Sequence, residues 1–288
     1  MAEEQQDQKP PHRGLKKGLY VIPTLFTAAN VAMGYLAVLW SIRGFQAAAN
    51  DPNLAASYYN GAGLAIGLAI LFDTVDGRIA RATRTATEIG VQFDSLADVL
   101  TFGIAPATLA YAWAIAPAFA ENTPGHNLGI FILFAFLMCG AFRLARFNLQ
   151  ATRPRVLIEG AVKVDKKAFV GLPIPPAGGL IASLVHFAPA PFSVYGENAA
   201  QFYGYALLAL VAILAILMIS TIRYTSMKTT GGPRQGFYIV LAIAAMAMAI
   251  WLYSKYALLI MAGGYVAHGV IWWIFRFFSS RFRPAKSS

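Results

Sequence analysis

Long runs of apolar residues, separated by short polar segments, dominate the chain and contain few charges. About 20 consecutive apolar residues in a helix cross the ~30 Å hydrocarbon layer of a bilayer. Read with a window of that length, the sequence predicts eight helices, at residues 23–43, 60–80, 95–118, 128–148, 169–190, 200–222, 236–254 and 256–275. Turn-forming residues punctuate the pattern, among them a predicted loop at Pro52-Asn53. The pattern therefore predicts an all-α polytopic membrane protein.

The composition supports this prediction and excludes a soluble protein. Apolar residues make up 58% of the 288 residues, and charged residues 12%, about half of the ~25% that is usual in soluble proteins. So few charges could not cover the surface of a globular protein of this size. The single cysteine, Cys139, excludes an intrachain disulfide and a cysteine-based zinc site.

The basic residues predict the topology. With the eight helices above, 21 of the 23 lysines and arginines fall on one side of the membrane, and only Arg43 and Lys255 fall on the other. Cytoplasmic loops carry the excess of basic residues, so both termini should be cytosolic. In the N-terminal segment 1–22, the stretch 13–22 fits an interfacial helix and fits equally well an ordinary basic flank.

Four aspartates lie at the ends of two neighbouring predicted helices. Asp73 and Asp76 are three residues apart and Asp94 and Asp98 four apart, so each pair shares a helix face. Each unpaired aspartate near mid-membrane costs ~2.5–3.5 kcal/mol. Nearby arginines can offset part of this cost, but four hard oxygen donors at this spacing suit one or two divalent cations, Mg²⁺ or Mn²⁺ above softer metals.

Small residues flank the aspartates. Gly77, Ala80 and Gly90 would let a ligand approach the helices closely, although small residues are also common where membrane helices pack. Intramembrane aspartates occur in cation and proton-coupled transporters as well. A transporter, however, leaves the spacing of the small residues around the aspartates unexplained.

These residues together resemble the signature of the CDP-alcohol phosphotransferases at every defining position. The matching string is Asp76-Gly77-x-x-Ala80-Arg81, eight residues, Gly90, three residues, Asp94, three residues and Asp98, with Asp73 three residues ahead. The resemblance implies a six-helix membrane core over residues 23–228 with a cytosol-facing cavity, in a chain that is usually a homodimer. Two additional transmembrane helices and a basic tail would then occupy residues 229–288.

The resemblance also implies roles for the residues of the signature. Asp73, Asp76 and Asp94 would bind Mg²⁺ or Mn²⁺, with two ions expected, and Asp98 would be a further ligand or the general base. The CDP moiety would be bound by Gly77, Ala80, Arg81 and Gly90.

Three further stretches, 139–148, 169–175 and 220–224, resemble the serine-using members of this family from bacteria and archaea. This implies a prokaryotic inner-membrane enzyme with a cytosolic active site that transfers phosphatidyl from CDP-diacylglycerol to L-serine and releases CMP. Arg143 and Arg146 share a helix face where they could hold the serine carboxylate, or simply snorkel to the membrane surface. Glycerol 3-phosphate, inositol phosphate and choline stay open as acceptors.

Some positions depart from the family pattern or have no predicted role. Thr24 stands where the family more often has Asn, so a polar contact to the nucleotide could come from Thr24, Thr27 or Asn30. The aromatic residues are expected to pack or to lie at the membrane interfaces, and we expect no nucleic-acid partner. No metal or catalytic role is expected of the four histidines, His12, His126, His186 and His268.

Overall fold

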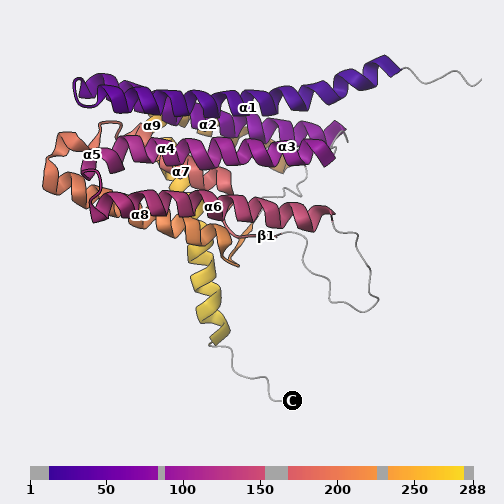
Figure 1. The fold of residues 1–288 in the computed structure, drawn as a ribbon. Helices are drawn as coiled ribbons and strands as arrows, with labels where there is room; N and C mark the ends of the chain where they lie inside the picture. The colour runs from indigo at the N-terminus through magenta and orange to yellow at the C-terminus, as the bar shows by residue number, and fades with distance from the viewer. Residues whose placement is uncertain (1–12, 84–87, 153–167, 226–232, 282–288) are drawn as a thin grey trace, which may run out of the picture.

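The computed structural model describes residues 13–83, 88–152, 168–225 and 233–281, and these residues are almost entirely helical (Figure 1). The long helices are α1 (Arg13–Ala47), α2 (Pro52–Thr83), α6 (Pro124–Thr152), α8 (Glu197–Ile219) and α9 (Pro233–Arg281). Within the described residues, six segments are long and apolar enough to span a membrane: Thr24–Ala47, Pro52–Ile79, Ile89–Ala118, Pro124–Leu149, Glu197–Ile219 and Met248–Trp273. The prediction of a helical polytopic membrane protein is confirmed.

Two helices begin earlier than the apolar pattern predicts. α1 starts at Arg13 and continues through Pro23, so the stretch 13–22 is continuous with the helix that contains the membrane span Thr24–Ala47. Its place at the membrane interface stays a prediction. α2 starts at Pro52, where the sequence predicts a loop, because Asp51 caps it: its Oδ1 accepts 3.0 Å hydrogen bonds from the backbone N–H groups of Asn53 and Leu54. Proline is well suited to the first helical position, since its missing N–H is not needed there.

The third membrane segment is one long rod of changing helix type. It consists of α3 (Glu88–Asp98), the π-helix η1 (Val99–Ile104), α4 (Ala105–Ala110), the π-helix η2 (Tyr111–Ile115) and α5 (Ala116–Ala118). Each π-helix ends just before an Ala-Pro pair, at Pro106 and Pro117. A proline inside a helix removes one backbone hydrogen bond and crowds the preceding turn. The wider π turns accommodate this disturbance without breaking the rod.

The fifth predicted helix is much shorter than expected. Residues 169–190 were predicted to span the membrane, but α7 covers only Ile174–Phe187, 14 residues, or about 21 Å at 1.5 Å per residue. Pro173 is extended before it, and β1 (Ala168–Val170) pairs antiparallel with β2 (Arg223–Thr225). Gly171 joins the strand to the helix at φ +84°, and a Cβ there would clash with the Met218 carbonyl oxygen, 2.3 Å away. α7 is thus a short, buried central helix.

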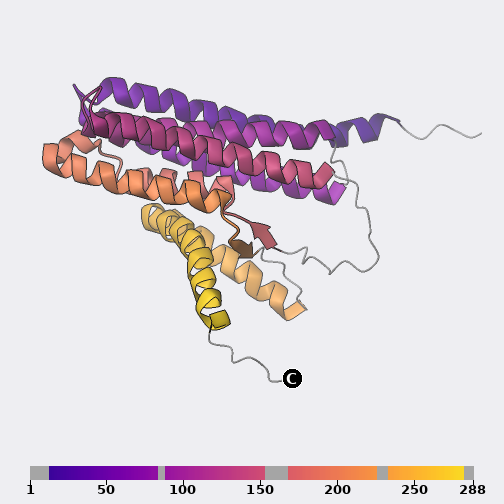
Figure 2. The same ribbon diagram turned by 60° about the horizontal axis from the view of Figure 1, so that its bottom comes forward.

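Helix α9 bends at Tyr253, whose backbone is non-helical (φ −137°, ψ 49°). The sequence predicts two helices here, 236–254 and 256–275, and the bend falls near their boundary. A separate membrane span over 236–254 stays a prediction. α9 packs against α7, and its two arms diverge below the other helices in Figure 2.

A buried histidine ties α9 to the rest of the bundle. The His186 Nδ1 of α7 lies 2.7 Å from Asn60 Oδ1 of α2, and its Nε2 lies 2.9 Å from Ser254 Oγ of α9. Three helices therefore meet at one side chain. The C-terminal helix, outside the six-helix core that the sequence predicts, packs directly on that core.

Candidate active site

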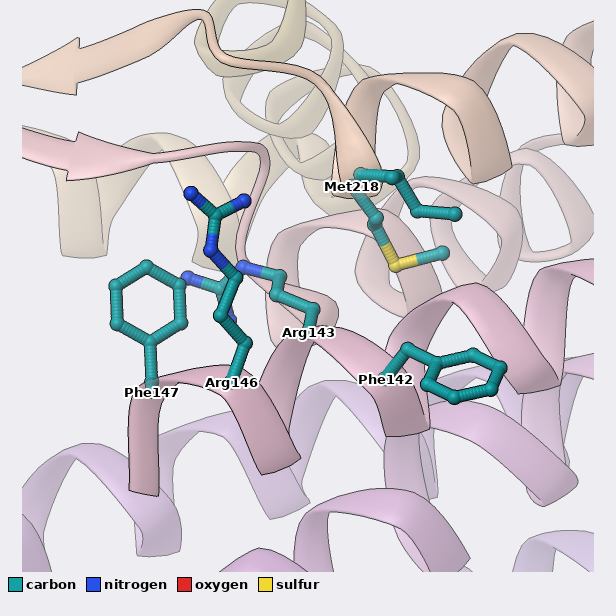
Figure 3. Close-up of a pocket in the computed structure, with 6 residues that line it drawn as sticks. Phe142, Arg143, Arg146, Phe147 and Met218 are labelled. Carbon is teal, nitrogen blue, oxygen red and sulfur yellow. The ribbon is translucent and has the colours of Figure 1, made fainter. Parts of the chain in front are cut away.

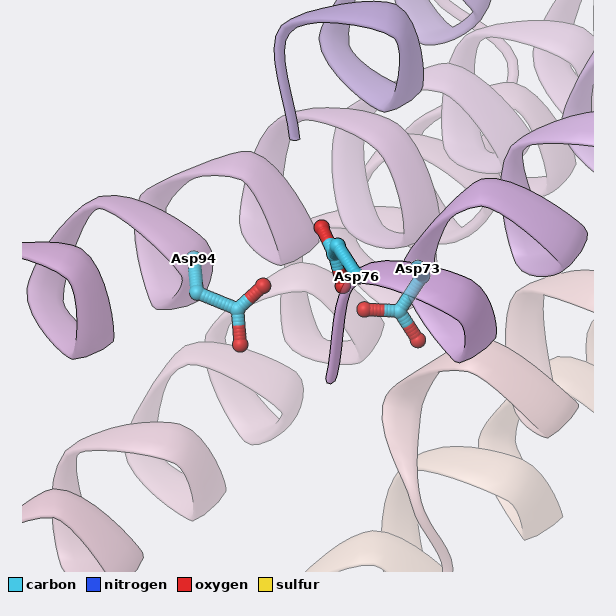
Figure 4. A group of neighbouring side chains, drawn as sticks. All are labelled: Asp73, Asp76 and Asp94. Atoms are coloured by element: carbon cyan, nitrogen blue, oxygen red, sulfur yellow. The ribbon is translucent and has the colours of Figure 1, made fainter. Parts of the chain in front are cut away.

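Three of the four predicted aspartates come together at one end of the helix bundle. Asp73 and Asp76 lie near the end of α2, and Asp94 lies in the second turn of α3. One carboxylate oxygen of each lies within 4.8 Å of the others. Figure 4 shows the three carboxylates converging from the two helices. Asp76 is buried, and Asp73 and Asp94 are half-buried.

A residue from a third helix orients one of these carboxylates. Thr27 of α1 is buried, and its Oγ1 donates a 2.9 Å hydrogen bond to Asp76 Oδ2. From the sequence alone, Thr27 is predicted only as one of three possible polar contacts to a nucleotide. Its bond to an aspartate 49 residues away shows that α1 forms one wall of the acidic cluster.

Asp98 lies deeper than the three clustered carboxylates but close enough to each of them for an electrostatic interaction. The α3 helix places it one turn beyond Asp94, where it is 8% exposed, and its Oδ1 has no hydrogen-bond partner in the described part of the chain. It is not among the three carboxylates that meet within 4.8 Å. The four predicted metal ligands thus divide into a group of three and a deeper, buried carboxylate.

A hydrogen-bond network that the sequence did not reveal attaches α3 to α6. Asn148 of α6 donates from Nδ2 to Ser95 Oγ at 2.8 Å and to Gln92 Oε1 at 3.3 Å. Ser95 in turn donates to the carbonyl of Val91. Ser95 directly follows Asp94 in the chain, so this network fixes the turn of α3 that carries Asp94. Its only signal in the sequence is the position of these polar residues next to the aspartate and the arginine pair.

The predicted arginine pair lines a small pocket between α6 and α8 (Figure 3). Arg143 is buried, its guanidinium carbon lies 4.7 Å from the ring centroid of Phe147, and it is close enough to Asp98 for an electrostatic interaction. Arg146 is exposed. The structure therefore directs Arg143 toward the acidic residues and Arg146 toward the open side of the same pocket. The pocket residues are Phe142, Arg143, Arg146, Phe147, Met218 and Ile219.

The other signature residues lie on the same two helices. Gly77 is half-buried near the end of α2, one residue after Asp76, and Gly90 is exposed in the first turn of α3. Ala80 and Arg81 belong to α2, but their side chains lie outside the described part of the structure. Of the three polar candidates on α1, Thr24 is exposed and Asn30 is fully buried.

The donor set of the cluster fits a hard divalent cation. Three carboxylates from two helices offer oxygen ligands only, which is the chemistry that Mg²⁺ and Mn²⁺ prefer. Without a cation, three negative charges so close together would repel one another. The residues present therefore suit a divalent metal bound by Asp73, Asp76 and Asp94.

The fold and the site together define a polytopic membrane protein with an acidic cluster at one end of its helices whose donors suit a divalent cation. The family model for the CDP-alcohol phosphatidyltransferases matches residues 20–217. The chain belongs to this family and is a membrane-embedded transferase of substituted phosphate groups. A transporter is thereby set aside.

Comparison with curated proteins gives relatives over most of the chain. The CDP-diacylglycerol–serine O-phosphatidyltransferase of Helicobacter pylori is 29% identical over 274 residues, covering 94% of this chain and 98% of the relative. The enzyme of that name from Methanocaldococcus jannaschii is 33% identical over 208 residues, covering 72% and 81%. The archaetidylserine synthase of Methanothermobacter thermautotrophicus is 33% identical over 212 residues, covering 73% and 72%.

Proposed function

We propose that this enzyme transfers the phosphatidyl group of CDP-diacylglycerol to L-serine, forming phosphatidylserine and CMP. The observation that carries the chemistry is the meeting of Asp73, Asp76 and Asp94 within 4.8 Å beside the deeper Asp98. Serine as the acceptor is supported by the relatives that align with most of the chain and are named as serine O-phosphatidyltransferases. In the reaction, the serine hydroxyl oxygen bonds to the phosphorus that carries diacylglycerol, and the bond from that phosphorus to CMP breaks.

The cluster would hold the divalent cations that the family chemistry needs, Mg²⁺ or Mn²⁺, with two ions expected. When bound, such ions neutralise the diphosphate and stabilise the departing CMP. Asp76 is held by Thr27 Oγ1 and is buried, so its carboxylate is oriented before any ligand arrives. Preorganised ligands of this kind need no rearrangement during the reaction.

Asp98 is suited to accept the proton of the serine hydroxyl. It is buried, its Oδ1 has no partner among the described residues, and it lies one helical turn from Asp94. A base at this depth removes the proton as the oxygen attacks, and the nearby Arg143 offsets part of the repulsion that the three clustered carboxylates exert on its charge. The family chemistry then proceeds as a direct in-line displacement.

The remaining predicted residues would bind the two ends of the substrates. Gly77 and Gly90 leave room beside the cluster for the CDP moiety, with Ala80 and Arg81 as further contacts. The guanidinium groups of Arg143 and Arg146 line one pocket and would hold the serine carboxylate. The excess of basic residues on one side of the membrane supports an active site and both termini in the cytosol. We also expect a prokaryotic inner-membrane enzyme that forms a homodimer.

The test is CMP release by the purified full-length protein in mixed micelles with CDP-diacylglycerol. We expect release that requires both L-serine and Mg²⁺ or Mn²⁺, together with phosphatidylserine in equal amount. Glycerol 3-phosphate, inositol phosphate and choline are offered in parallel. If CMP release were faster with one of these compounds than with serine, that compound would be the acceptor. CMP release without a divalent metal would contradict metal binding by the acidic cluster.

A further inference from the structure

Buried polar atoms without partners concentrate beside the acidic cluster. Five buried side-chain atoms have no hydrogen-bond partner in the described part of the chain, and four of them belong to Asn30, Asp98 and Arg143. Asn30 is the extreme case. It is 0% exposed, and neither its Oδ1 nor its Nδ2 has a hydrogen-bond partner among the described residues. A buried amide without hydrogen bonds is costly, so such a group calls for an explanation.

Asn30 lies one layer deeper than the metal-binding carboxylates. It follows Thr27, the partner of Asp76, by three residues on α1, or about 4.5 Å along the helix. Asp98 follows Asp94 by four residues on α3, or about 6 Å. Both helices start at the same end of the bundle (Figure 1). Asn30 and Asp98 therefore share a depth just beyond the cluster.

The two residues also lie at the same helix interface. The Oγ1 of Thr101, one turn after Asp98, donates to the backbone carbonyl of Asn30 at 3.3 Å. Gly34, one turn after Asn30, approaches Thr101 so closely that a Cβ would lie 2.6 Å from Thr101 Oγ1. The face of α1 that carries Asn30 thus packs against the junction of α3 and η1 that carries Asp98.

We infer that the Asn30 side chain, together with Asp98, forms the inner end of the acceptor site and recognises the amino-acid part of the acceptor. This inference rests on the proposed function. An amide offers two donor hydrogens and one acceptor oxygen. Its Nδ2 can donate to a carboxylate while its Oδ1 accepts from an ammonium group, which matches a zwitterionic amino alcohol such as serine. Asp98 Oδ1 beside it accepts the hydroxyl proton.

The arrangement separates acceptor recognition from nucleotide binding. The carboxylates that suit a metal and a diphosphate lie nearer the helix ends, and Gly90 lies there as well. Asn30 and Asp98 lie further along the same helices, beyond the level that a nucleotide held at the cluster has to reach. Removal of the Asn30 amide should therefore weaken binding of the acceptor and leave binding of CDP-diacylglycerol unchanged.

The test compares the steady-state kinetics of Asn30→Leu with those of the wild-type protein in the CMP-release assay. Leucine has the same branched shape and number of side-chain heavy atoms as asparagine but cannot hydrogen-bond. We expect the KM for L-serine to rise about 10–100-fold, as for lost hydrogen bonds to charged groups. The KM for CDP-diacylglycerol and the kcat at saturating serine should each stay within about 3-fold, the range left to indirect effects of a buried substitution.

Ser41→Ala is the matched control. Ser41 lies on the same helix and is equally buried, but its Oγ donates to the Ala37 carbonyl of its own helix at 2.7 Å, remote from the aspartates. Its serine KM should match that of the wild type. Because the Asn30 side chain has no hydrogen-bond partner to lose in the described part of the chain, Asn30→Leu should also melt no lower than the wild type.

Two results would overturn the inference alone. One is serine-dependent CMP release by Asn30→Leu with an unchanged KM for serine. The other is failure of both Asn30→Leu and Asn30→Ala to fold, which would make Asn30 a structural residue. CMP release by the wild type that is independent of serine would instead overturn the proposed function, and this inference with it.

Discussion

Thr27 Oγ1 donates a 2.9 Å hydrogen bond to Asp76 Oδ2 and so connects the first membrane helix to the acidic cluster on the second. The bond holds one oxygen of a buried carboxylate in a defined direction. Residues that orient metal-binding side chains typically change metal affinity or activity 10–100-fold when they are removed. We therefore expect the threonine hydroxyl to support cation binding at the cluster even though it carries no charge.

Thr27→Val removes this hydroxyl at nearly constant volume. We expect the concentration of Mn²⁺ or Mg²⁺ that gives half-maximal CMP release to rise about 10–100-fold, while saturating metal restores most of the activity. Thr108→Val is the control, because the Thr108 Oγ1 bonds at 2.9 Å to the Ile104 carbonyl of its own rod. An unchanged metal requirement in Thr27→Val would show that the bond serves packing and not the cation.

We expect the three clustered carboxylates to bind the divalent metal jointly. Asp94→Asn removes one negative charge from the group without changing its shape, and we expect CMP release at ordinary metal concentrations to fall by at least about 100-fold. Chelation of divalent ions should abolish the wild-type activity, and added Mg²⁺ or Mn²⁺ should restore it.

Asp51→Asn makes the same chemical change far from the cluster. Asp51 caps α2, and asparagine caps helices about as well as aspartate, so this variant should retain wild-type activity and melting temperature. Equal losses in Asp94→Asn and Asp51→Asn would mean that the loss at Asp94 reflects folding rather than metal binding.

The position of Asp98 separates the role of base from the role of ligand. Asp98→Asn should lower kcat by about 10²–10⁴-fold, the usual contribution of a general base, while CDP-diacylglycerol binds the protein almost as tightly as before. A direct binding measurement with the purified variant checks the second part. If excess Mn²⁺ rescued the turnover of Asp98→Asn, Asp98 would be a metal ligand; wild-type turnover would exclude both roles.

The apolar pattern predicted the long membrane helices because transfer of apolar side chains into lipid dominates their placement. It could not predict the short α7, since the prolines at 173, 175 and 176 and the strand pairing of β1 with β2 override the hydrophobic run. It also missed the start of α2, which depends on the cap at Asp51. A hydropathy profile shows neither the shortening of α7 by prolines and strand pairing nor the helix cap at Asp51.

The sequence identified the aspartates of the site but not how they are supported. The motif spacing places Asp73 and Asp76 on one face of α2, and the structure brings Asp94 to them. The bond from Thr27 and the network at Asn148 join residues about 50 positions apart, and only the packing of four helices, α1, α2, α3 and α6, creates them. The separate depth of Asp98 likewise depends on that packing.

The last prediction concerns the stability of the rod that carries Asp94 and Asp98. In η2, the N–H of Ala116, which an α-helix would direct to the Ala112 carbonyl, bonds to the Tyr111 carbonyl, and the next residue, Pro117, has no N–H. The hydroxyl of Tyr59, which is fully buried on α2, donates to the Ala112 carbonyl at 2.7 Å instead. Tyr59 thus compensates for the disturbance that Pro117 introduces.

Tyr59→Phe should therefore lower the free energy of unfolding by about 1–3 kcal/mol, because a buried carbonyl loses its donor while the ring stays in place. Thermal melting of the detergent-solubilised protein measures this, and activity per folded molecule should stay close to wild type, since Ala112 is about four helical turns from Asp98. Tyr58→Phe, the neighbouring and less buried tyrosine, should melt like the wild type. Equal melting of all three proteins would mean that the π-helix does not depend on this bond.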